Sequence, residues 1–133
     1  MATHLVYSDI YLEHDTGPHP ETAQRLSRTI SYLKTTPLWN KVKHLQPRPA
    51  TPEEVSYVHN PVYVKSIREF CASGHTFLDA DTVVSARSYE VALNAVGGAL
   101  KAVDAVMETP GSNALCLVRP PGHHATVNHA MGF

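Results

Sequence analysis

The chain has 133 residues, of which 43% are hydrophobic and 17% charged, so it can bury the core of one ordinary domain. Its 11 basic and 12 acidic residues give a formal net charge of −1 and form no basic run, so direct binding to nucleic acid or to a membrane surface is not expected. No apolar stretch approaches the roughly 20 residues of a membrane span, and no secretory signal opens the chain. We therefore expect an intracellular protein, in the cytoplasm or, if the source is eukaryotic, the nucleus.

The first part of the chain predicts a strand, a loop and a helix. Residues 4–8 form a short apolar run that is typical of a strand. Polar residues 9–19 follow, with Gly17-Pro18 as a turn signal. Proline suits the first position of a helix, and the next apolar residues have helical spacing. The sequence therefore predicts a helix from Pro20 to about Thr35.

The middle of the chain predicts a short strand and two helices. The strand covers residues 42–45. Residues 51–54 read Thr-Pro-Glu-Glu, a capping box that predicts a short helix ending near Val58. A second helix is expected over residues 61–72, and residues 75–84 are expected to form a loop.

The last predicted elements are a long helix and a strand. The helix begins at Ser85 or Ser88 and reaches about Glu108, and its small residues 97–99 indicate close packing against a sheet. Residues 113–118 are nearly all apolar, which predicts a strand buried on both faces of a parallel sheet. The order of strands and helices predicts an α/β fold in one domain, or in part of one.

The two cysteines are far apart in the sequence and show no CxxC spacing. Cys71 falls in a predicted helix and Cys116 in the predicted buried strand. We expect two free buried thiols, with a disulfide or a metal role as the alternatives.

Two adjacent histidines follow the last predicted strand, in the sequence Arg-Pro-Pro-Gly-His-His-Ala at residues 119–125. Ligands of α/β sheets bind at the carboxyl ends of strands, and a Pro-Pro-Gly turn would hold both imidazoles in place there. A neutral imidazole can accept a proton from water near pH 7. His123 and His124 are therefore candidates for general-base catalysis of a hydrolysis, whereas a solvated pair is the alternative.

Residues 119–125, together with Met131-Gly132-Phe133, resemble the tandem-histidine motif of the histone deacetylase superfamily, in the form of its class II and bacterial amidohydrolase branch. Residues 19–21, His-Pro-Glu, with Arg25 look like an early motif of the same family. The resemblance covers the whole chain in order. Three further segments support it: Val58-His59 with Tyr63, Asp79-Ala80-Asp81-Thr82, and Ser88 before the long helix.

The resemblance implies a role for each matching position. His124 would be the general base that activates a zinc-bound water, and His123 would position that water and steady the developing charge. Gly132 and Phe133 would line the channel for the acyl-lysine chain. Arg25 would lie in an internal cavity behind the metal, where the acetate product is handled.

Two acidic residues, Asp79 and Asp81, match a loop that approaches the channel rim in this family. Acidic loop residues are usually only solvated, so this assignment depends on the resemblance alone. The remaining histidines of interest are expected to be structural or surface residues: His14, His19, His59, His75 and His129.

In this family zinc is held by an Asp-x-His pair and a later Asp, all beyond the Gly-Phe pair, whereas the chain ends at Phe133. We therefore expect no metal ligand within this chain, and Zn²⁺ in the intact enzyme. Residues 1–133 would be an incomplete deacetylase domain, the N-terminal part of the arginase/deacetylase fold with a parallel sheet flanked by helices. A metal site made of His123, His124 and His129 alone is the alternative.

The implied function is zinc-dependent hydrolysis of the acetyl-lysine amide in histones or other proteins, with the chain inactive on its own. One alternative is a deacetylase of acetylpolyamines or other small acylated amines. A second alternative is a catalytically inactive fragment that acts as a binding module. An unrelated serine hydrolase is disfavoured because the sequence contains no Gly-x-Ser-x-Gly element.

Overall fold

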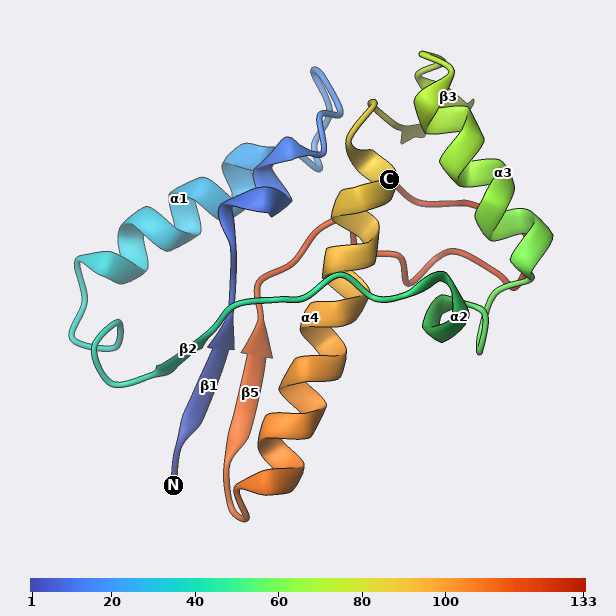
Figure 1. Cartoon of the computed structure of the whole chain (residues 1–133). Coiled ribbons are helices and arrows are strands. Elements are labelled where there is room, and N and C mark those ends of the chain that lie inside the picture. Colours follow the sequence, from blue (N-terminus) through green and yellow to red (C-terminus); the bar gives the residue numbers. More distant parts are fainter.

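The computed structural model describes all 133 residues, and it contains a three-stranded parallel sheet flanked by helices (Figure 1). Strand β1 (Thr3–Val6) lies in the middle, with β2 (Lys43–Leu45) on one side and β5 (Asn113–Cys116) on the other. Both neighbours pair with β1 in parallel. This arrangement confirms the predicted α/β class.

The chain leaves β1 through a 3-10 helix, η1 (Asp9–Glu13), and returns to β2 through α1 (Ala23–Lys34). The predicted helix began earlier, at Pro20. The structure instead holds the residues before α1 in a hydrogen-bonded turn, because the backbone N–H of Glu21 donates to Nδ1 of His19 at 3.0 Å. Helix α1 therefore begins later than predicted because the His19 side chain accepts the hydrogen bond from Glu21 N.

Two helices follow β2 as predicted. Helix α2 (Pro52–Val55) has the expected capping box, in which Thr51 Oγ1 accepts from the backbone N–H of Glu54 and the Glu54 carboxylate accepts from that of Thr51. Helix α3 (Pro61–Ala72) begins after Asn60, whose side chain accepts from Val62 N.

The segment expected to be a loop after α3 is an antiparallel hairpin of β3 (Phe77–Asp79) and β4 (Thr82–Val83). Its turn is closed by Asp79, whose Oδ1 accepts from the backbone N–H of Asp81 at 2.8 Å. Aspartate side chains commonly close turns in this way. The prediction of a loop over residues 75–84 was therefore wrong, because part of this segment forms two paired strands.

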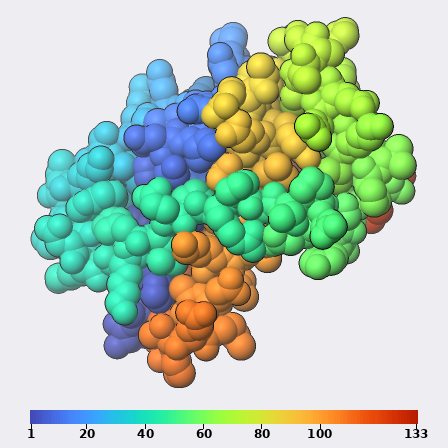
Figure 2. All heavy atoms as spheres, viewed as in Figure 1, coloured from blue at the N-terminus to red at the C-terminus, as the bar shows by residue number.

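Helix α4 (Ser88–Glu108) packs on β1 and β5, and it is also crossed by the segment between β2 and α2 (Figure 2). A Cβ atom on Gly97 would overlap the backbone carbonyl of Arg48, and one on Gly98 would lie 2.6 Å from the hydroxyl oxygen of Tyr11. The predicted close packing through small residues is confirmed, and it involves the crossing segment as well as the sheet side.

Strand β5 differs most from the prediction. It ends at Cys116, it lies at the edge of the sheet with β1 as its partner, and its first three residues are exposed. Leu115 is 51% exposed. The expectation of a strand buried on both faces was wrong, because an apolar run does not tell whether neighbouring elements cover it. Cys116 is only half-buried for the same reason, whereas Cys71 is buried.

The core lies where η1, α1 and α4 meet, and the segment after β5 runs from there toward α3, so that the C-terminus lies near the start of α4 (Figure 1). None of the helices combines the length and apolarity that a membrane crossing needs. The central buried residues are Tyr11, Leu26, Val91 and Ala95.

Candidate active site

The loop that carries the two histidines, residues 119–133, begins at a fully buried arginine, Arg119. Its guanidinium donates to both carboxylate oxygens of Glu21, with Nη2 2.8 Å from Oε2. It also donates to the backbone carbonyls of Tyr11, at 3.0 Å, and of His14. Arg119 thus joins the end of β5 to η1 and to the turn before α1. Arg119 belongs to the predicted tandem-histidine motif, but no role was predicted for it.

Glu21 is ionised in this environment. Burial alone would raise the pKa of its carboxyl, but hydrogen bonds from Arg119 and then Arg25 outweigh that effect and hold the pKa below its ordinary value. The pair is a buried salt bridge, in which Glu21 is 8% exposed and Arg119 is fully buried. Two features of the sequence could have indicated this salt bridge. One is the acidic residue of the His-Pro-Glu motif, and the other is the arginine directly after an apolar strand.

His123 and His124 lie on an exposed turn. The turn is closed by a hydrogen bond from Ala125 N to Gly122 O at 3.1 Å, and Gly122 has a φ of 75°, which glycine adopts without strain. The two imidazole centroids are 4.3 Å apart, with the rings tilted by 53°. The two rings therefore lie close together in differently oriented planes, and their shared catalytic role stays a prediction.

Gly132 lies directly against the His124 ring. Its φ is +74°, and a Cβ atom there would lie 2.5 Å from His124 Cδ2 and 2.6 Å from His124 Cβ. Only glycine fits this position without moving the histidine. The Phe133 ring meets His124 edge-on, with centroids 6.5 Å apart and an interplanar angle of 88°. The structure thus brings three predicted site residues together.

The β3–β4 hairpin is connected to His124, Gly132 and Phe133 through His19. Nε2 of His19 lies 3.0 Å from Oδ1 of Asp81, and the His19 ring packs edge-on against Phe133 at 4.8 Å. Asp79 is used differently: its carboxylate accepts backbone hydrogen bonds within the turn, chiefly from Asp81, and these lower its pKa. His19 was expected to have only a structural or surface role, and the sequence contained no signal for its pairing with Asp81.

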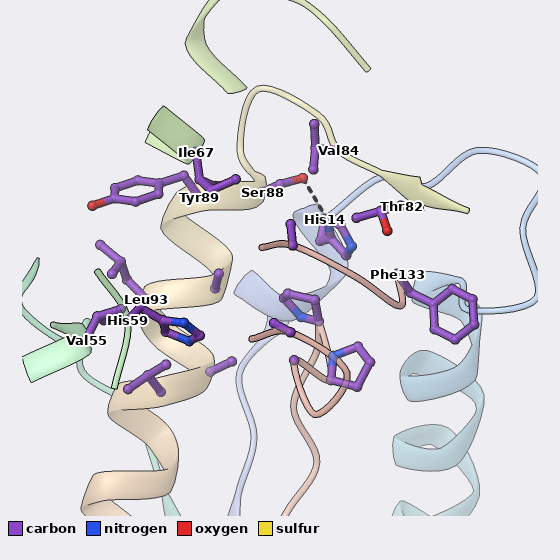
Figure 3. A pocket seen from close by; sticks show the side chains of 18 of the residues that line it. His14, Val55, His59, Ile67, Thr82, Val84, Ser88, Tyr89, Leu93 and Phe133 are labelled. Atoms are coloured by element: carbon purple, nitrogen blue, oxygen red, sulfur yellow. Dashed lines mark hydrogen bonds between the residues drawn. The ribbon is translucent and has the colours of Figure 1, made fainter. Parts of the chain in front are cut away.

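A mostly apolar pocket of about 430 Å³ lies between α3, α4 and the loop of residues 119–133 (Figure 3). Phe133 lines it on the side opposite His59 and Leu93 (Figure 3). Neither His123 nor His124 lines it, so the pocket meets the candidate site only at its edge. Because catalysis needs groups that touch the reacting atoms, the histidine pair, and not this apolar pocket, is the candidate site.

Residues 19–133 match the model of the family described as histone deacetylase domain. The chain belongs to the histone deacetylase family. It is 35% identical over 136 residues to a protein of Archaeoglobus fulgidus described as "Probable deacetylase", covering 100% of this chain and 38% of that protein. It is 35% identical over 144 residues to the human "Polyamine deacetylase HDAC10", covering 100% of this chain and 22% of the human protein.

The fold comparison agrees with this family. The crystal structure of the HDA15 HD domain is similar with a TM-score of 0.91 and 28% sequence identity, covering 99% of this chain and 39% of that chain. A histone deacetylase-like amidohydrolase of Pseudomonas aeruginosa is 30% identical over 98% of this chain and 39% of its own length. The chain therefore corresponds to less than half the length of these histone deacetylase relatives.

Arg25, which the histone deacetylase resemblance placed in an internal cavity, has a side chain that is 47% exposed on α1. It donates to Glu21 Oε1 from Nη2 at 3.0 Å and from Nε at 3.3 Å. The internal-cavity position of Arg25 stays a prediction for the intact enzyme, and the buried arginine within these 133 residues is Arg119.

The zinc that is implied by the histone deacetylase family does not fit the residues of this chain. Within residues 1–133 no group of three or more histidine, cysteine, aspartate or glutamate side chains lies close enough to hold a metal ion. A catalytic zinc site needs three protein ligands and an open position. The alternative site made of His123, His124 and His129 is contradicted by the same observation.

Proposed function

We propose that this chain supplies the histidine pair and part of the channel wall of a deacetylase that removes acetyl groups from lysine side chains of histones or other proteins. The observation that carries the proposal is the fit of Gly132 against His124, at a place where a Cβ atom would lie 2.5 Å from the ring. If His124 is the base and Gly132 is part of the channel wall, the two must be in contact, and only glycine allows that contact. Membership of the histone deacetylase family supports the same reading.

The proposed chemistry is the hydrolysis of an amide. His124 takes a proton from the attacking water, the water oxygen bonds to the acyl carbon, and the C–N bond breaks as the amine nitrogen receives a proton. Acetate and a free amine leave. His123, tilted against His124 with ring centroids 4.3 Å apart, is placed to hydrogen-bond the same water or the developing oxyanion.

The Phe133 ring is expected to favour a substrate whose amine carries a long aliphatic chain. An aromatic edge beside the base can cover methylene groups, and each buried CH₂ contributes about 0.8 kcal/mol. We expect Zn²⁺ in the intact enzyme, with ligands outside these 133 residues, because the chain groups no three metal-binding side chains. The chain by itself is accordingly expected to be inactive.

A second candidate substrate is a small acylated amine such as an acetylpolyamine. Two observations favour it: the 35% identity with the human polyamine deacetylase, and the exposed carboxylate of Asp81, 69% accessible, beside the proposed channel wall. A carboxylate at a channel rim would attract the second ammonium group of a polyamine. The two substrates differ in this charge, so one assay separates them.

The test uses a chimera in which the part of the Archaeoglobus fulgidus relative beyond the matched region follows Phe133. The zinc-loaded chimera is expected to release acetate from an acetyl-lysine peptide, and His124→Ala is expected to lower kcat by about a hundredfold or more. His75→Ala, an exposed histidine distant from the pair in sequence, serves as the control.

A folded, zinc-loaded chimera in which His124→Ala is as active as the parent would refute the assigned base. Faster turnover of acetylspermidine than of the peptide would establish the small-amine alternative. A chimera that binds zinc but hydrolyses neither substrate would favour the binding module. Zinc-dependent turnover by the 133-residue chain alone would contradict the expected position of the metal ligands.

A further inference from the structure

We propose that His19, oriented by Asp81, is a positioning residue that holds Phe133 beside His124. The expected effect of this contact on substrate binding rests on the proposed function. The expected effect on the orientation of Phe133 does not. The chain of contacts runs from the Asp81 carboxylate to the His19 ring, from that ring to Phe133, and from Phe133 to His124.

The hydrogen bonds of His19 determine its tautomer. The backbone N–H of Glu21 can only donate, and it points to Nδ1 of His19 at 3.0 Å, so Nδ1 carries no proton. The proton of the neutral ring is therefore on Nε2, from which it is donated to Asp81 Oδ1 at 3.0 Å. Each ring nitrogen thus has one partner of the correct kind, and the two bonds together prevent the ring from rotating.

The fixed ring is well placed to act on its neighbour. The side chain of His19 is only 11% exposed, so it is held by packing as well as by its two hydrogen bonds. Its face-to-edge contact with Phe133, at 4.8 Å and 62°, is within the range in which aromatic pairs attract each other. This contact gives the Phe133 ring an orientation that its backbone alone does not.

Glu21 links the two ends of the histidine loop. Its backbone N–H holds His19, and through that ring Phe133, while its carboxylate holds Arg119. The start and the end of the loop of residues 119–133 are therefore fixed to one residue of the His-Pro-Glu motif. A change at His19 should move the Phe133 end without releasing the Arg119 end.

The test measures NMR signals of the isotope-labelled 133-residue chain. We expect Nδ1 of His19 to be the unprotonated nitrogen, and we expect nuclear Overhauser contacts between the His19 and Phe133 rings. Asp81→Ala removes the acceptor of Nε2–H, so the contacts should weaken and the ring resonances of Phe133 and His124 should shift. Asp81→Asn keeps an oxygen acceptor and should restore both, and Asp104→Ala is a control for an exposed aspartate on α4.

The proposal is overturned if the Ala and Asn variants at position 81 behave alike, or if the His19 proton is found on Nδ1. The tautomer is read in the unmodified chain, so it remains decisive should a variant fail to fold. His19→Gln is the second variant: it removes the ring, and unchanged Phe133 and His124 resonances in a folded His19→Gln chain would also refute the proposal.

A kinetic readout in the chimera separates positioning from mere stability. Asp81→Ala is expected to raise KM for an acetyl-lysine peptide about fivefold with kcat nearly unchanged, because the contact of Phe133 with the aliphatic chain is made equally before and in the transition state. Loss of kcat alone would contradict the positioning role. An inactive chimera would refute the proposed function but would not affect the NMR test of the contact between His19 and Phe133.

Discussion

The guanidinium of Arg119 and the carboxylate of Glu21 form a buried ion pair between residues 98 positions apart, with Nη2 2.8 Å from Oε2. The same arginine donates to the backbone carbonyl of Tyr11 in η1. These bonds tie the end of β5 to the turn before α1, and the histidine loop starts from this fixed point. The exposed histidines therefore have a rigid support on one side.

Glu21→Ala is expected to lower the free energy of unfolding by about 3 kcal/mol or more, because it leaves the charge of Arg119 buried without a partner. Urea unfolding followed by circular dichroism measures this loss. Arg25→Ala is the matched control, since it removes the half-exposed partner of the same carboxylate and should cost less than about 1 kcal/mol. Equal losses in the two variants would show that Arg119 is not the main partner.

The stability of the chain is expected to fall as the pH drops from about 6.5 to about 4. Burial, and then the charge of Arg119, lower the pKa of His14 to about 4 from its ordinary value of 6.5. The unfolded chain thus takes up a proton at His14 in this window and the folded chain does not, so low pH favours unfolding. Glu21, whose pKa is also lowered, adds to the fall only below its ordinary value of 4.5.

Urea unfolding at several pH values between 4 and 7 checks this dependence, with a slope of at most about 1.4 kcal/mol per pH unit from one group. His14→Gln should remove the slope above pH 4.5, and His75→Gln, at an exposed position, should keep it. A flat stability profile in the unmodified chain would be inconsistent with a neutral buried His14.

Gly132→Ala is expected to displace the His124 ring, because the new Cβ would lie 2.5 Å from its Cδ2. Gly111→Ala is a matched control, since Gly111 also has a positive φ, +78°, but nothing lies within 4 Å of the added atom. Both variants carry similar backbone strain of about 1 kcal/mol. The His124 resonances should shift only in the first variant, and a shift of equal size in both would point to backbone strain as its cause.

Gly97→Ala is expected to destabilise the chain by about 3 kcal/mol or more, because the added carbon would overlap the backbone carbonyl of Arg48, which cannot rotate away. Thermal unfolding measures the loss. Val103→Ala, at a position of α4 that is 60% exposed, is the control and should change stability by less than about 1 kcal/mol. A stable Gly97→Ala variant would show that the segment between β2 and α2 can move off α4.

Features that depend on residues within one or two turns of each other could be predicted from the sequence. The capping box at Thr51 and Glu54 and the helix over residues 61–72 were both confirmed. A cap or a helix start uses hydrogen bonds between neighbours in the chain, so the sequence contains both partners side by side. The histidine motif was recognisable for the same reason, as a continuous stretch.

Only the tertiary structure decided which arginine is buried, whether β5 is covered, and which acid holds His19. Arg25 and Arg119 both form a salt bridge with Glu21. They differ in exposure, which is 47% for Arg25 and 0% for Arg119, and this difference depends on which elements surround each guanidinium. The partners of the Asp81 to His19 hydrogen bond are 62 positions apart. Such contacts depend on the path of the whole chain through space, because desolvation and charge pairing act between whichever groups the fold brings together, and no local pattern records that path.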